Sequence, residues 1–129
     1  MRAVHEYNEN RRVPQQVAAL ENGDFDTFLR LTKESGFSSW MYLQHVIPAG
    51  YKNEQAMAIA LALCEKYLCG KGAYRVHGGG FAGTVQAFVP YDILDSFKAG
   101  IDAARGEGAC HFLSLRPQGG VRAVPADNA

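Results

Sequence analysis

Four glycines fall within the six residues from 78 to 83, between two short segments that have the pattern of β-strands. Residues 73–76 are bounded by glycine, and residues 84–89 alternate so that Val85 and Ala87 share a face, which is the period of a strand. Glycine loses more conformational entropy on folding than any other residue, and an ordinary hairpin does not need so many glycines. The sequence therefore predicts two strands joined by a loop in which bare backbone is needed.

The loop contains a formal match to the dinucleotide-binding pattern G-x-G-x-x-G, through Gly78, Gly80 and Gly83. That pattern requires a helix to begin at its last glycine, because the helix N-terminus holds the pyrophosphate, whereas residues 84–90 are β-rich and end in proline. No Gly-Lys-Ser/Thr follows the glycines, which argues against a Walker phosphate loop. Two interpretations stay open: N–H groups that converge on an anion, or a tight, bulged connection packed closely on a buried helix.

The first half of the chain shows helical patterns separated by turn residues. Residues 4–22 form the first predicted helix. Its apolar residues recur at Val13, Val17 and Leu20. A second helix begins after Asp24, which can cap it, and ends at Gly36. A short third helix is expected before Pro48, because proline disfavours helix in the residue that precedes it.

The strongest helical pattern covers residues 54–68, which carry apolar side chains on most sides and predict a central, buried helix. Its main apolar stripe consists of Met57, Leu61, Cys64 and Leu68. Residues 91–105 return to helical spacing, and residues 109–115 and 121–124 have the pattern of a terminal hairpin. Together these helices and strands predict an α+β fold, in which a helical N-terminal half packs on a four-stranded antiparallel sheet.

The composition is that of a soluble globular domain, because 47% of the 129 residues are apolar and 20% are charged. The 13 basic and 13 acidic residues are evenly mixed, so no electrostatic field favours nucleic acid or an anionic membrane. No apolar run is long enough for a membrane span, and the polar start of the chain does not indicate secretion. The three cysteines, an odd number, suit reduced thiols. Together these features predict a cytoplasmic protein.

Two stretches of the chain carry a family resemblance. Residues 2–35 are RAVHEYNENRRVPQQVAALENGDFDTFLRLTKES, with an Arg-x-x-His-x-x-x-Glu start, an Arg-Val, an alanine-leucine pair and Gly-Asp. Residues 72–90 are GAYRVHGGGFAGTVQAFVP. The first resembles the C-terminal region of galactokinases, and the second resembles the third conserved motif of their family, the GHMP small-molecule kinases. The resemblance implies that residues 1–129 form a single GHMP kinase C-terminal domain, with a ferredoxin-like fold and without the N-terminal kinase half.

The resemblance also implies that the glycine loop forms one wall of the substrate and nucleotide cleft. The residues concerned are His77, Gly78, Gly79, Gly80, Phe81, Ala82 and Gly83. Two of them depart from the family pattern. His77 stands where the family has threonine or serine, so a larger imidazole replaces a short hydroxyl donor. Ala82 stands where the family has glycine, and its Cβ limits the approach of the backbone to a ligand.

What the family implies is the phosphorylation of a sugar hydroxyl by ATP, with ATP and Mg²⁺ bound mainly by the N-terminal half. This sequence contains no Pro-x-Gly-x-Gly-Leu-Ser-Ser-Ser phosphate loop and no Gly-Arg-x-Asn sugar-binding start. We therefore expect no catalytic residue and no metal ligand here, and no tight binding of ATP or Mg²⁺ by this chain alone.

Two functional interpretations follow from the resemblance. One is the C-terminal portion of a galactokinase-like kinase for galactose or a related sugar, inactive alone, which binds sugar and ATP only with the N-terminal half. The alternative is a non-catalytic ligand-binding or protein-interaction module derived from a GHMP kinase. Because a missing half leaves an apolar face exposed, a homo-oligomer or a partner chain is also expected.

Two residues beside the glycines have competing interpretations. Arg75, directly before the loop, either reaches a phosphate or lies solvated on its strand. His77 carries a ring that titrates near pH ~6.5 when unperturbed. No acidic residue nearby in the sequence can orient it, which favours a positioning or packing role over that of a general base.

Other candidates lie on separate predicted elements. Trp40, Tyr42 and Tyr51 could line the face of a sugar, and core packing is the alternative for aromatic residues at helical spacing. The remaining histidines are His5, His45 and His111, and nothing in the sequence groups them.

Overall fold

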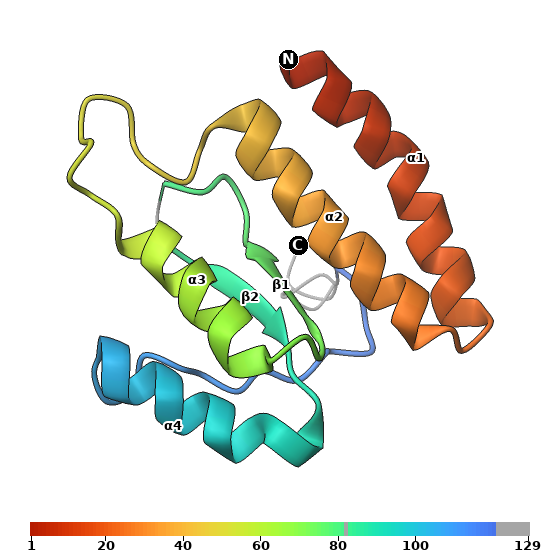
Figure 1. Ribbon diagram of the computed structural model, residues 1–129. Coiled ribbons are helices and arrows are strands. Elements are labelled where there is room, and N and C mark those ends of the chain that lie inside the picture. Colours follow the sequence, from red (N-terminus) through yellow and green to blue (C-terminus); the bar gives the residue numbers. More distant parts are fainter. Residues whose placement is uncertain (82, 121–129) are drawn as a thin grey trace, which may run out of the picture.

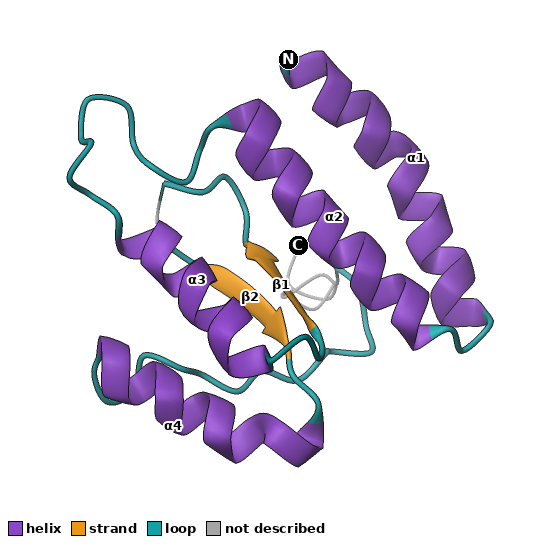
Figure 2. Ribbon diagram, in the orientation of Figure 1, coloured by secondary structure: helices purple, strands orange, loops and turns teal. Residues whose placement is uncertain are grey.

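The computed structural model describes residues 1–81 and 83–120. In that part of the chain, four α-helices and two β-strands follow the order α1, α2, α3, β1, β2, α4, with one 3-10 turn, η1, before α4. Helices α1 and α2 lie side by side along one flank, α3 and α4 lie on the other, and the strands lie between the two pairs (Figures 1 and 2).

Helices α1 (Arg2–Glu21) and α2 (Phe25–Leu43) form an antiparallel hairpin. Gly23 makes the turn with a φ of 70°, a conformation that glycine adopts without steric cost. The carboxylate of Asp24 caps α2 by accepting a hydrogen bond of 3.0 Å from the backbone N–H of Thr27. The predicted first helix and the predicted cap of the second are therefore confirmed.

The apolar residues that identify α1 do not mark its buried face. Val13, Val17 and Leu20 have exposed fractions of 52%, 49% and 46%, whereas His5 and Ala19 are buried. The inward side of α1 is mainly polar, and its side chains form hydrogen bonds with α2. Helical spacing thus predicts the element correctly but not which side of it packs.

Helix α2 continues through Gly36 to Leu43, so the predicted end at Gly36 and the separate short helix after it are wrong. A Cβ built on Gly36 would lie 2.8 Å from the Cβ of Arg75 on β1, which is closer than Cβ atoms approach one another. Glycine is required here because α2 packs directly on the strand. Its role is close contact and not the termination of the helix.

Helix α3 (Ala56–Leu68) provides the centre of the apolar core, as its sequence pattern predicts. Its buried residues are Met57, Leu61, Cys64 and Leu68. They pack against Tyr74 and Val76 of β1 and against Phe97 and Ile101 of α4. The helix begins at Ala56, two residues later than the predicted start at residue 54, with Gln55 at the N-cap.

Strands β1 (Ala73–Val76) and β2 (Val85–Phe88) pair antiparallel, with Val76 opposite Val85 and Ala73 opposite Phe88. After β2 the chain turns through η1 (Tyr91–Ile93) into α4 (Leu94–Arg105), which lies against α3. Gly100 of α4 lies against the ring of Tyr67, and a Cβ at that position would come within 2.5 Å of the ring.

The predicted four-stranded sheet, and with it the ferredoxin-like fold, is wrong, because the sheet in the described residues has two strands. Residues 109–115, expected to form a third strand, have no strand structure, and Leu113 and Leu115 are 92% and 88% exposed. A strand needs a neighbour with which to pair, and an alternating pattern alone does not supply one. The expected strand at 121–124 lies outside the described residues.

Candidate functional site: the glycine loop

The glycine loop, residues 77–83, connects β1 to β2 at one end of the hairpin. The backbone N–H of His77 donates a hydrogen bond of 2.9 Å to the carbonyl of Thr84, which extends the ladder one step beyond the strands. The N–H of Gly83 donates a bond of the same length to the carbonyl of Gly80. The loop is thus closed at its base and turns tightly before β2.

Three of the four loop glycines are bordered by open space. A Cβ built on Gly78, Gly79 or Gly83 would meet no atom of the described residues within 4 Å. Gly78 and Gly83 have φ values of 68° and 83°, which explains why glycine occurs there. Gly79 has neither a positive φ nor a close neighbour. Nothing within the described chain requires glycine at Gly79.

The backbone of the loop also presents unused donors. Among the described residues, the N–H groups of residues 78–81 form no backbone or side-chain hydrogen bond. His77, Gly78 and Gly79 are exposed, and Phe81 has 64% of its surface exposed. Ala82 lies outside the described residues. At its exposed residues 78, 79 and 81 the loop therefore has N–H groups without a partner in the described chain, and such groups can accept an anion.

Gly80 is different, because it is buried against His45. A Cβ on Gly80 would come within 2.6 Å of the backbone oxygen of His45 and 2.9 Å of its ring carbons. The close packing that the sequence allowed as an alternative interpretation therefore exists at one glycine, but its partner is His45 and not the buried helix α3. Sequence spacing contains no signal for this contact, since the two residues lie on different elements.

The ring of His45 is itself unusual. The residue is 4% exposed, and its Nδ1 is enclosed without a hydrogen-bond partner among the described residues. Burial lowers the pKa of the His45 imidazole, and the positive charge of Arg75 lowers it further. His45 is therefore held as a neutral ring beneath the glycine loop.

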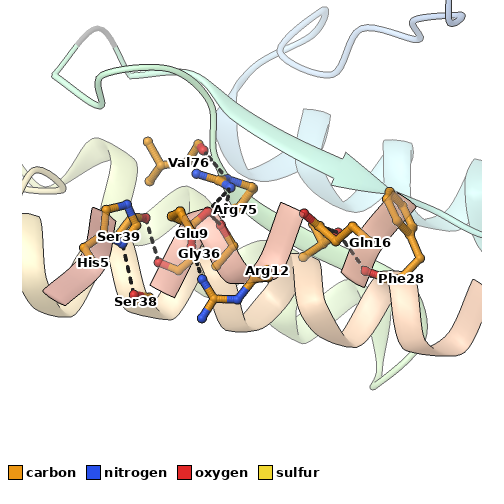
Figure 3. Close-up of polar contacts among 12 residues, drawn as sticks. His5, Glu9, Arg12, Gln16, Phe28, Gly36, Ser38, Ser39, Arg75 and Val76 are labelled. Carbon is orange, nitrogen blue, oxygen red and sulfur yellow. Dashed lines mark hydrogen bonds and ion pairs between the residues drawn. The ribbon is translucent and has the colours of Figure 1, made fainter. Parts of the chain in front are cut away.

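A group of polar side chains joins α1, α2 and β1 behind the loop, and we call it the polar seam (Figure 3). It consists of His5, Glu9, Arg12, Gln16, Thr32, Ser35, Ser38 and Arg75. In it the Ser35 hydroxyl donates a hydrogen bond of 2.6 Å to Glu9 and accepts one from Arg75. Glu9 also pairs with Arg12 and lies 3.9 Å from Arg75.

Arg75 precedes the loop but belongs to this seam. Its guanidinium also donates a hydrogen bond of 3.1 Å to the carbonyl of Val76. It is neither the solvated strand arginine nor the free phosphate ligand that the sequence suggested. Its position fixes the end of β1 against the helical hairpin, and so determines where the loop begins.

One histidine, His5, belongs to the seam, and nothing in the sequence grouped it with His45. The Nδ1 of His5 lies 3.0 Å from the hydroxyl of Ser38, and His5 acts electrostatically on His45. Burial lowers the pKa of His5 as well, with the charges of Arg75 and Arg12 adding to the effect. His111, in contrast, is exposed.

The aromatic candidates are not assembled into a sugar platform within the described residues. Trp40 is 37% exposed, Tyr51 is 70% exposed and Tyr42 is half-buried. The ring pairs in that part of the chain are Phe28 with Phe88 and Phe37 with Tyr74. These pairs attach α2 to the two strands.

The three cysteines are free thiols, as the sequence indicated. Cys64 is buried in the core, and its burial raises the thiol pKa to about 11. Cys110 packs against the same core, whereas Cys69 is exposed at the end of α3. Cys64 is therefore a small residue of the core, whereas Cys69 is not.

Two surface depressions lie away from the loop. The larger, of about 650 Å³, is bordered by α2 and the turn before β1, and includes Lys33, Phe37 and Lys71. The smaller, of about 260 Å³, lies beside Arg11 and Arg12. Neither contains a residue of the glycine loop.

No cluster of three or more metal-ligating side chains occurs in the residues that the structure describes. In the same part of the chain, no helix has the length and apolar character needed to cross a membrane.

Comparison with known proteins reveals a similarity to a galactokinase from Haemophilus influenzae. The two sequences are 30% identical over 97 residues, which cover 75% of this chain and 23% of the galactokinase. No family model matches the chain, and no solved structure matches it. The comparison indicates a galactokinase-like relationship. It does not show membership of the GHMP family, because no family model matches. The chain spans less than a quarter of that relative's length.

Proposed function

We propose that this chain is the C-terminal portion of a galactokinase-like sugar kinase, in which ATP phosphorylates galactose or a related sugar. The observation that carries the proposal is the open side of the glycine loop, where Gly79 has no structural reason to be glycine and the N–H groups of residues 78–81 are unused. The similarity to a galactokinase supports the choice of reaction.

In this proposal the loop supports the chemistry without performing it. Phosphoryl transfer depends on positioning and on neutralisation of charge by metal and cationic groups. Arg75, the cation nearest to the loop in sequence, is engaged by Glu9 and Ser35. In this proposal Mg²⁺ is held by the N-terminal half and not by this chain.

The remaining parts of the site would come from polypeptide beyond these 129 residues. ATP, Mg²⁺ and the sugar would bind to the assembled kinase, and the loop would form one wall of the cleft. This arrangement predicts that the isolated chain transfers no phosphoryl group from ATP to galactose. Transfer by the purified chain alone would overturn the proposal.

A chimera provides the positive test. The part of the Haemophilus influenzae galactokinase that matches this chain is replaced by residues 1–129, and ATP-dependent phosphorylation of galactose is measured. The proposal predicts activity in the chimera and none in the galactokinase from which that part is deleted. A folded chimera that binds ATP but has no more activity than the deletion would support the non-catalytic module instead.

A further inference from the structure

His45 is the one buried side chain in the described residues whose polar atom lacks a hydrogen-bond partner. A buried nitrogen that loses its water without gaining a partner is destabilising, so such atoms call for a structural or functional reason. The residue directly follows the end of α2, where Gln44 adopts a left-handed φ of 56° and turns the chain toward the glycine loop.

The contact between His45 and Gly80 leaves no space for a side chain at position 80. Both the backbone oxygen and the ring of His45 lie where a Cβ on Gly80 would be. Gly80 has a φ of 99° and is buried, while its neighbours Gly78 and Gly79 are exposed. At Gly80 the loop therefore rests on the protein, and the contact is with the imidazole and carbonyl of His45.

The surroundings of His45 oppose a second positive charge. The described groups whose charge acts on it are Arg75 of β1 and His5 of α1, and both disfavour the imidazolium. Glu9 is the acidic member of the seam, but it already pairs with Arg12 and lies 3.9 Å from Arg75. A protonated His45 would thus bring an unpaired cation into a buried site next to an arginine.

We propose that His45 is the proton-sensitive support of the glycine loop. The neutral ring packs against Gly80 and holds the open side of the loop in place. When the ring takes up a proton, its charge drives it toward water, and Gly80 loses its support. The N–H groups of residues 78–81 then no longer form a fixed surface. This inference concerns the position of the loop and does not depend on the proposed kinase function.

Nuclear magnetic resonance of the ¹⁵N- and ¹³C-labelled chain tests the proposal. The ring resonances of His45 and the amide resonances of Gly78, Gly79 and Gly80 are followed as the pH is lowered from about 7.5 to about 5.5. We expect the loop amides to shift or broaden with the midpoint of the His45 ring, below the ordinary value of 6.5. The amide of Gly23, in the turn between α1 and α2, serves as a reference that stays constant.

Variants separate His45 from the other histidines. His45→Phe keeps an aromatic ring that cannot titrate, and should remove the pH dependence of the loop amides. If that variant does not fold, His45→Gln provides the same test with a smaller polar side chain. His5→Gln and His77→Gln are the matched controls, and both should retain the pH dependence.

Two results would overturn the proposal. One is a wild-type loop whose amides stay unchanged while the His45 ring titrates. The other is a loop that shows the wild-type pH dependence in the His45 variants. The first result would mean that protonation of His45 does not affect the loop. The second would mean that another titratable group controls the pH dependence of the loop.

Discussion

Gly36 of α2 and Arg75 of β1 lie so close that a Cβ on Gly36 would be 2.8 Å from the Cβ of Arg75. This contact lets the helix rest directly on the strand that leads into the glycine loop. Arg75 is then within reach of Ser35, one residue earlier on the same helix. The loop is therefore positioned from behind by α2 as well as by its own hairpin.

The first prediction concerns whether replacing a helical glycine with alanine stabilises or destabilises the protein. In an exposed helix interior, Gly→Ala stabilises by about 0.5–1 kcal/mol, but Gly36→Ala should destabilise by about 1–3 kcal/mol because its Cβ overpacks the contact with Arg75. Urea denaturation measures the change. Gly79→Ala is the control, since a Cβ there meets nothing within 4 Å, and it should be nearly neutral. A more stable Gly36→Ala variant would show that α2 and β1 are not in this contact.

Gly36 also illustrates what the sequence can and cannot specify. The apolar stripe of α3 and the alternation in β1 and β2 are local patterns, and the structure confirms the elements that they predict. A glycine within a helical pattern is ambiguous, because helix ends and close contacts both favour it. Only the presence of Arg75 opposite Gly36 decides between them, and that contact joins residues 39 positions apart.

A second prediction concerns the outer face of α1. Val17 is 49% exposed, so Val17→Lys should change the free energy of unfolding by no more than about 0.5 kcal/mol. Leu31→Ala is the comparison, because Leu31 is 4% exposed and its truncation should cost about 2–5 kcal/mol. Thermal denaturation of both variants provides the measurement. A large loss of stability in Val17→Lys would mean that this face of α1 is covered.

The polar seam leads to a third prediction. Ser35 is fully buried and bonds to both Glu9 and Arg75, so Ser35→Ala should destabilise by about 1–3 kcal/mol because it leaves partners unsatisfied. Ser114 is exposed, and Ser114→Ala should have almost no effect. Chemical denaturation distinguishes the two. Equal effects at the two positions would contradict a stabilising role for the seam.

A fourth prediction is that stability falls on mild acidification. The pKa values of His5 and His45 are both lowered in the folded state from 6.5, chiefly by burial. The unfolded chain therefore binds these protons more readily, and the free energy of unfolding should decrease as the pH falls below about 6.5, until the folded state is protonated as well. The double variant His5→Gln/His45→Gln should have a flatter profile between about pH 7 and about pH 5.

The control for this profile is His111→Gln, because His111 is exposed. It should reproduce the wild-type dependence on pH. A wild-type stability that stays constant or rises across this range would contradict the buried, neutral state of the two histidines.

The glycine loop itself was predictable from its sequence, since dense glycines between two strand patterns indicate a loop with exposed backbone. The residues that hold the loop in place were not predictable from the sequence. His45 and Arg75 reach the loop through the packing of α2 against β1, and no periodicity connects these residues. The absent sheet strand at 109–115 has a similar cause, because its alternation specifies a face but not a neighbour with which to pair.

The most direct test of the account is to fill the open side of the loop in the galactokinase chimera. Gly79 and Gly119 both lack a positive φ, and a Cβ on either meets nothing within 4 Å among the described residues. Gly79→Leu and Gly119→Leu should therefore have similar effects on stability. The account predicts that Gly79→Leu lowers kcat/KM for ATP by about tenfold or more, because the new side chain displaces the ligands from their reacting positions, whereas Gly119→Leu does not. Equal activity of the two chimeras, both folded, would contradict the claim that the glycine loop is a wall of the kinase cleft.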